Sequence, residues 1–234
     1  VGLISLCFLL FLSNCSSNKL AADDADYTYD TKIKDLDPNY LVYHENKDSS
    51  YLYLSIRTAN LLYVRENSSK PFEAELQVVY QLFEDSKGRV LLDSGTHTLY
   101  DYKTSNEPKE ILTRIPFQLA LGKTGYLKIE TRDVNKRVKD KLIMEINKKD
   151  VRSQQFFLFK NPSSESLYFD TYFTSEKEVE IISEFNKNES VRVDFFNTDF
   201  PPSLPPFSSN QKIEIASVRD SGYTIVFDGK KTLV

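Results

Sequence analysis

Apolar residues alternate with polar ones in many short stretches of this chain, and this period of two constrains the fold more than any other feature. Leu52, Leu54 and Ile56 fall on one face of an extended segment, and Leu127 and Ile129 do so further along. Successive side chains of a β-strand point to opposite faces, so each such segment can bury one face of a sheet. No stretch offers a long amphipathic helical pattern. We therefore expect an all-β chain that folds as two consecutive antiparallel β-sandwich-like domains.

A polar run at 147–152 predicts the boundary between the two domains. The first domain spans 37–148, with a hairpin turn at 133–136 and strands expected at 51–57, 74–83, 90–92, 111–117, 126–131 and 138–146. The second domain spans 149–234, with strands expected at 155–159, 167–169, 179–182, 191–196, 213–215 and 223–227. Little chain follows the last of these strands, so we expect the second domain to be incomplete at its C-terminal end.

The first fifteen residues resemble the start of a bacterial lipoprotein. The apolar run at 3–12 has the length of a signal-peptide core and is too short for a transmembrane helix. It ends in Leu12-Ser13-Asn14-Cys15, which resembles a lipobox, although Asn14 departs from the usual small residue. We expect 1–14 to be a signal peptide, Cys15 to carry the lipid, and 15–36 to form a flexible tether. The alternative is an ordinary cleaved signal with incidental cysteines.

This anchor predicts a protein of the cell envelope, held at the outer membrane through its N-terminal lipid. The acidic residues of the tether begin only at Asp23, so the sequence leaves open whether the protein faces the periplasm or the cell surface. The run starts at Val1 without a Lys or Arg before it, which indicates that the charged beginning of the signal is missing.

Composition argues against several functions. The net charge of -4 gives no basic face for nucleic acid. Both cysteines lie within the first fifteen residues, which excludes a disulfide framework and a cysteine metal site in the folded part. Neither His44, expected at a strand start, nor His97, expected at a strand-flanking turn or facing outward, has a catalytic motif beside it. We expect a structural or solvent-facing role for each, and no catalytic residues, metal or cofactor.

Two segments are candidates for binding a partner. Tyr51 and Tyr53 lie on the strand face opposite Leu52 and Leu54, where an exposed aromatic strip could bind peptide or glycan. The favoured alternative is that the neighbouring domain covers this face. The second candidate is a proline-rich loop whose residues are Phe200, Pro201, Pro202, Pro205, Pro206 and Phe207. The favoured alternative there is a loop that bridges two strands, with its phenylalanines at the edge of the core.

Several longer segments resemble the GWxTD-domain lipoproteins of Bacteroidota. The resemblance is carried by PNYLVYH at 38–44, SYLYLSIR at 50–57, LLYVR at 61–65 and the stretch 193–208 with its FP-x-x-x-PPFS ending. These segments span most of the chain. The naming motif contains tryptophan and this chain has none, so the resemblance is to the family's N-terminal β-rich region. It implies location and architecture, and it implies no activity.

Three functions remain open at this stage. The favoured expectation is a non-enzymatic scaffold or protein-interaction module within an outer-membrane assembly. The second is a surface glycan-binding module, which the absence of tryptophan weakens because sugar platforms rely on its large apolar face. The third is an accessory region to an enzyme that lies in a C-terminal part beyond this sequence.

Overall fold

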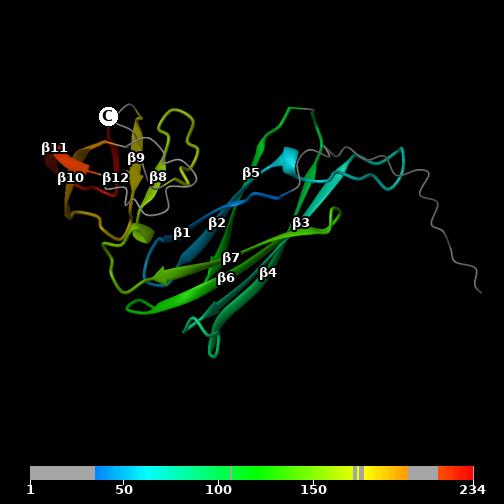
Figure 1. The fold of residues 1–234 in the computed structure, drawn as a ribbon, viewed down its shortest axis with the longest axis horizontal. Coiled ribbons are helices and arrows are strands. Elements are labelled where there is room, and N and C mark those ends of the chain that lie inside the picture. The colour runs from blue at the N-terminus through cyan, green and yellow to red at the C-terminus, as the bar shows by residue number, and fades with distance from the viewer. Residues whose placement is uncertain (1–34, 106, 171–172, 174–176, 200–215, 234) are drawn as a thin grey trace, which may run out of the picture.

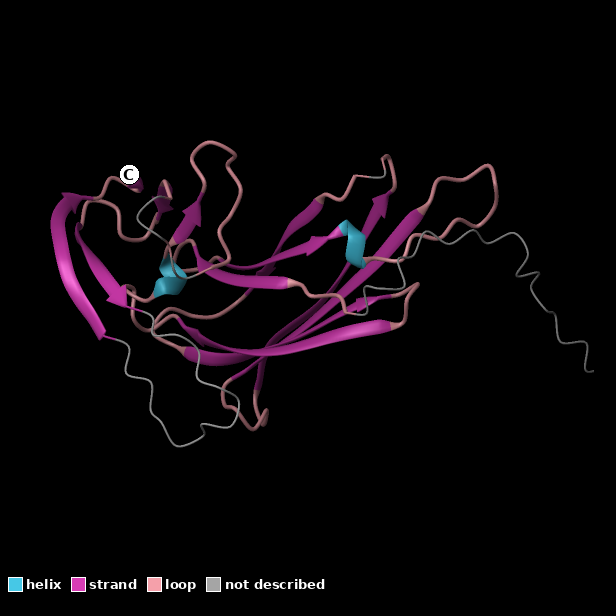
Figure 2. Ribbon diagram, turned by 45° about the horizontal axis from the view of Figure 1, so that its top comes forward, coloured by secondary structure: helices cyan, strands magenta, loops and turns pink. Residues whose placement is uncertain are grey.

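The computed structural model describes residues 35–105, 107–170, 173, 177–199 and 216–233 (Figure 1). The predictions for the signal peptide, for Cys15, for the tether up to residue 34 and for the loop from Phe200 to Phe207 fall outside this set. The described chain is all-β, as the alternation predicts, and its sheets are antiparallel. Figure 2 shows that strands make up almost all of its regular structure, beside two single-turn helices. None of the helices in this set is long and apolar enough to cross a membrane.

Seven strands form the first unit, which is a sandwich of two sheets. One sheet has the order β1-β2-β5 and the other β4-β3-β6-β7. The strands are β1 (Asn39–His44), β2 (Ser50–Arg57), β3 (Glu73–Phe83), β4 (Leu91–Tyr102), β5 (Glu110–Phe117), β6 (Thr124–Asp133) and β7 (Val138–Asn147). A single 3-10 turn, η3 (Thr58–Asn60), follows β2. The two sheets cross face to face in Figure 1, which is the arrangement expected when each buries its apolar side.

The core lies between the two sheets and is built from the alternating residues. Leu52, Leu54 and Ile56 of β2 are fully buried, as are their counterparts on β3 and β6, which are Leu76, Val78, Leu82, Leu127 and Ile129. Polar contacts also join the sheets, since the Tyr40 hydroxyl of β1 donates to Thr131 Oγ1 of β6 at 2.8 Å. Leu36, which lies within the predicted tether, is buried in this core as well.

Strand β4 is much longer than the 90–92 segment that the sequence indicates. Its stretch from Asp93 to Thr98 is polar or small, and most of its side chains are exposed or half-buried, so the apolar signal is absent. Pairing with β3 along its length defines the strand instead. The two histidine positions also differ from expectation. His44 ends β1, and His97 lies within β4 opposite Val78, on the inward face, where it stacks near Tyr80 at a ring distance of 6.4 Å.

The second unit is smaller and consists of two sheets. A 3-10 turn, η4 (Gln154–Phe156), leads into a sheet of order β12-β9-β8, made of β8 (Leu158–Lys160), β9 (Val179–Ile182) and β12 (Lys230–Leu233). The strands β10 (Ser190–Asp199) and β11 (Ala216–Val226) pair with each other as a ribbon. The strand expected at 167–169 is only an isolated bridge between Lys160 and Leu167, and the strand expected at 213–215 lies outside the described residues.

The two units meet at the end of the sandwich where β1 ends and β2 begins. Phe156 is fully buried there, with its ring 5.0 Å from that of His44 and 5.1 Å from that of Phe185. The Asn186 side chain donates to the Val151 carbonyl at 3.0 Å. The junction is therefore a cluster of aromatic rings in tilted and edge-to-face contact, closed by a hydrogen bond, and the polar linker expected at 147–152 is part of it.

Candidate functional site

The outward side of the three-stranded sheet carries the two tyrosines that the sequence singled out. Tyr53 of β2 pairs with Arg114 of β5, and Tyr51 pairs with Pro116. The Arg114 guanidinium carbon lies 4.9 Å from the centre of the Tyr51 ring, and the two tyrosine rings are 6.5 Å apart. Leu112, two residues before Arg114 on the same face, is 49% exposed. We call these four side chains, Tyr51, Tyr53, Leu112 and Arg114, the aromatic–arginine face.

The second unit covers one end of this side of the sheet and leaves the rest partly open. Tyr43 of β1 points to the same side as Tyr51 but is only 2% exposed, and its hydroxyl accepts a hydrogen bond from the Glu184 backbone N–H at 3.4 Å. Tyr51 and Tyr53 themselves are half-buried, and Arg114 is exposed. Burial raises the pKa of Tyr53, and a hydrogen bond from Arg114 opposes the rise. The second unit thus covers Tyr43, while Tyr51 and Tyr53 keep part of their surface exposed.

A buried polar cluster sits at the junction and was not foreseen from the sequence. Lys148 Nζ donates to Ser50 Oγ at 2.9 Å, and His44 Nδ1 lies 2.9 Å from the same oxygen. Because an ammonium only donates, the serine hydroxyl accepts from Lys148 and is free to give its own proton to a neutral imidazole. Burial, together with the Lys148 charge, lowers the pKa of His44 to about 4, while the Gln155 side chain opposes the shift. The ring is therefore neutral near pH 7.

A serine between two nitrogen bases has the composition of a nucleophilic site, yet this cluster is closed to substrate. Ser50 is 1% exposed, and His44 and Lys148 are 0% exposed. A nucleophile must reach the reacting carbon of its substrate, and these three side chains leave almost no surface for a substrate to contact. Burial lowers the pKa of Lys148 as well. Lys148 Nζ, Ser50 Oγ and His44 Nδ1 pair with one another where the two units join, while His44 Nε2 forms no hydrogen bond with the described residues.

Within the described ranges, no three histidine, cysteine or acidic side chains gather as a metal site would require. Arg114 could not be identified as a site residue from the sequence, because only the register between β2 and β5 brings it to Tyr51. Lys148 could not be identified either, because it looks like a linker residue and is recognisable only from the packing of the unit that follows it. Of the residues predicted to bind a partner, Tyr51 and Tyr53 are among those that the structure describes, and both lie on a partly accessible face.

Comparisons with known proteins find no matching family model and no curated relative. Among solved structures, this chain has weak likeness to Bacteroides uniformis beta-glucuronidase, with 8% identity and a TM-score of 0.28 over 56% of this chain and 14% of that one. A calcium-binding mutant of Bacteroides uniformis beta-glucuronidase 2 gives 9% identity at the same TM-score. The same protein bound to a cyclophellitol-derived aziridine gives 11% identity and a TM-score of 0.27, over 58% of this chain and 15% of that one. The chain thus spans about a seventh of these enzymes, and at these scores the likeness carries no argument.

Proposed function

We propose that this protein is a lipid-anchored scaffold of the bacterial cell envelope that works by binding another protein at its aromatic–arginine face. In this proposal Cys15 carries the lipid at the outer membrane. The folded part is a non-enzymatic interaction module. The observation that carries the proposal is the stack of Arg114 on Tyr51 beside Tyr53 on an open part of the sheet.

The composition of that face suits protein recognition. Tyrosine and arginine are the residue types that most often dominate binding energy at protein interfaces, because they bury large areas and still offer hydrogen bonds. The face also carries Leu112, an apolar side chain that a partner would remove from water. Stacking holds Arg114 and Tyr51 in place before a partner arrives, which reduces the ordering cost of association.

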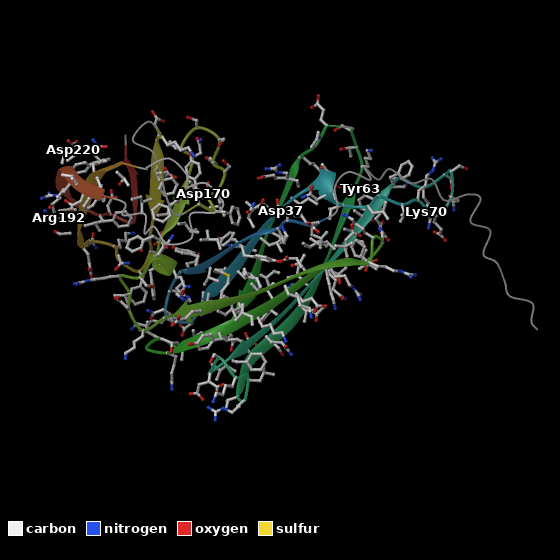
Figure 3. All side chains as sticks on the ribbon, in the orientation of Figure 1. Asp37, Tyr63, Lys70, Asp170, Arg192 and Asp220 are labelled. Atoms are coloured by element: carbon white, nitrogen blue, oxygen red, sulfur yellow. The ribbon has the colours of Figure 1, made fainter. Side chains whose placement is uncertain are left out.

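The form of the molecule supports a scaffold. Figure 3 places Arg192 and Asp220 at one end of the described chain and Lys70 at the other, so the two units extend in a line. The ion pairs of the β10–β11 ribbon, in which Asp194 accepts from Arg192 at 3.1 Å and from Arg219 at 2.8 Å, give the far end a charged surface. The near-complete burial of the Ser50, His44 and Lys148 side chains supports a role in binding over one in catalysis.

Co-purification from envelope fractions tests the proposal. We expect the paired substitution Tyr53→Ala and Arg114→Ala to reduce recovery of a partner by about tenfold or more, because two anchor side chains are lost. The matched control is Tyr100→Ala with Tyr102→Ala, which removes two exposed rings from β4 on the other sheet. The milder change Arg114→Lys keeps the charge and loses the planar stack, so it should give an intermediate loss. Equal recovery with both pairs of substitutions would contradict the proposal.

A further inference from the structure

A hollow of about 330 Å³ opens beside the β1–β2 turn, between that turn, β4 and the end of β5. Its lining includes Asp48, Tyr51, Tyr80, Asp93, Phe117 and Gln118. The volume is at the lower end of what small-molecule sites in proteins enclose. Aromatic rings and oxygen acceptors thus line one small concave site, which we call the Asp93 hollow.

The Asp93 carboxylate is fixed in this hollow by three donors. Its Oδ2 accepts from the Gln118 backbone N–H at 2.6 Å and its Oδ1 from the Ser94 backbone N–H at 2.8 Å. The third donor, the Tyr80 hydroxyl at 3.2 Å from Oδ2, shares its proton with the Pro116 carbonyl oxygen at the same distance. Each carboxylate oxygen can accept more than one hydrogen bond, so the group still has capacity for a ligand. It is a preoriented acceptor, because its own position requires no reorganisation.

A glycine makes this arrangement fit. A Cβ added at Gly95 of β4 would lie 2.6 Å from a ring carbon of Tyr80 and 3.1 Å from its hydroxyl oxygen. The ring can therefore lie across the strand only because residue 95 has no side chain. Burial, with the Asp93 charge next, raises the pKa of Tyr80 to about 12, so its hydroxyl remains a donor at neutral pH.

The charges of the lining favour a neutral ligand. Among the described residues no lysine or arginine lines the hollow, which disfavours an anion. The negative charge is also partly compensated. Hydrogen-bond donors surround Asp93, and Asp48 lies near enough to Lys148 for its charge to oppose the lowering of that amine's pKa by burial. A ring bearing several hydroxyl groups matches such a site, because hydroxyls donate to carboxylates while the C–H face of the ring packs on an aromatic side chain.

We propose that the Asp93 hollow binds one sugar unit of a neutral glycan, with the carboxylates of Asp93 and Asp48 accepting hydrogen bonds from its hydroxyls and Tyr51 lying against its apolar face. This site does not depend on the protein-binding role proposed above. Tyr51 belongs to both surfaces, so the experiment leaves Tyr51 unchanged. Loss of sugar binding is then distinguishable from loss of a protein partner.

Titration of the full chain with methyl glycosides of glucose, galactose, mannose and N-acetylglucosamine, followed in proton–nitrogen correlation spectra, tests this assignment. At least one glycoside should shift the Ser94 and Gln118 amides in a saturable way, with a Kd on the order of 1 mM. The Lys87 amide, which donates to Asp85 in a surface turn, should not move. Asp93→Asn should weaken binding by about tenfold, because an amide nitrogen replaces an acceptor oxygen.

A second variant keeps the test decisive if Asp93→Asn fails to fold. Asp48 is exposed, so Asp48→Asn leaves the core intact and should also weaken binding, whereas the matched change Asp85→Asn should have no effect. Absence of saturable shifts with all four glycosides would overturn the proposal. Stronger shifts with arginine amide or lysine amide than with any glycoside would also overturn it and would assign the hollow to a cationic peptide side chain.

Discussion

The variant Phe156→Ala is expected to lose about 4 kcal/mol of unfolding free energy, within the range seen when a buried aromatic ring is removed from a packed core. Phe156 is fully buried, and its ring touches both units, lying 5.0 Å from His44 and 5.1 Å from Phe185. Truncation leaves a cavity that the short η4 turn cannot fill. It also removes the apolar cover over His44 and the cluster behind it.

This loss of stability can be measured by denaturant unfolding that is monitored with two probes, one in each unit. The unmodified chain should unfold in one transition, and Phe156→Ala should lower the midpoint and separate the transition of the second unit from that of the sandwich. Phe156→Leu should cost less, since it retains most of the buried volume. Tyr100→Ala, an exposed ring on β4, serves as the control and should change stability by less than about 0.5 kcal/mol. A loss no larger than that of the control would mean that the junction is not packed as described.

The second large effect is a loss of about 3 kcal/mol of stability between pH 6.5 and pH 4, contributed by His44 alone. The folded protein holds the pKa of this buried imidazole at about 4, against an ordinary value of 6.5. In this window the unfolded chain takes up a proton that the folded chain does not, so acid favours unfolding. The contribution is fully present above pH 6.5 and is lost as the pH falls towards the folded value.

Carboxylates titrate in the same window, so the comparison must be made between variants. His44→Gln removes the titrating ring, and its stability should vary less with pH than that of the unmodified chain by about 3 kcal/mol over this range. Lys148→Met removes the neighbouring charge that helps to lower the pKa of His44, and it should reduce the pH dependence in part. Parallel pH profiles for all three proteins would show that the imidazole is not held in its neutral form by burial.

Much of the sandwich follows from local alternation, and particular residues show where that signal ends. Leu52, Leu54 and Ile56 predict β2 because one of its faces must be buried, and the same holds for β3 and β6. Strand β4 gives no such signal, since it lies at the edge of its sheet and its inward side chains are only half-buried. Its pairing with β3 is a tertiary interaction, which no local sequence pattern can reveal.

Each candidate site likewise depends on at least one residue whose role the local sequence does not reveal. Alternation alone puts Tyr51 and Tyr53 on the outward side of the sheet. Arg114 joins them only through the register of β2 with β5. In the cluster of His44, Ser50 and Lys148, the lysine is separated from Ser50 by 98 positions of sequence, and its local surroundings are those of a linker residue. The Asp93 hollow likewise depends on Gly95, whose lack of a side chain matters only once the Tyr80 ring is placed beside it.

Photo-crosslinking inside cells is the most direct measurement of whether the aromatic–arginine face binds a protein. A benzoylphenylalanine introduced at position 53 of the full-length chain should yield one discrete adduct with a single envelope protein after irradiation. The same group at position 102, where Tyr102 is 48% exposed on the other sheet, should yield none. Adducts that are equally abundant at both positions, or absent at position 53, would contradict the account.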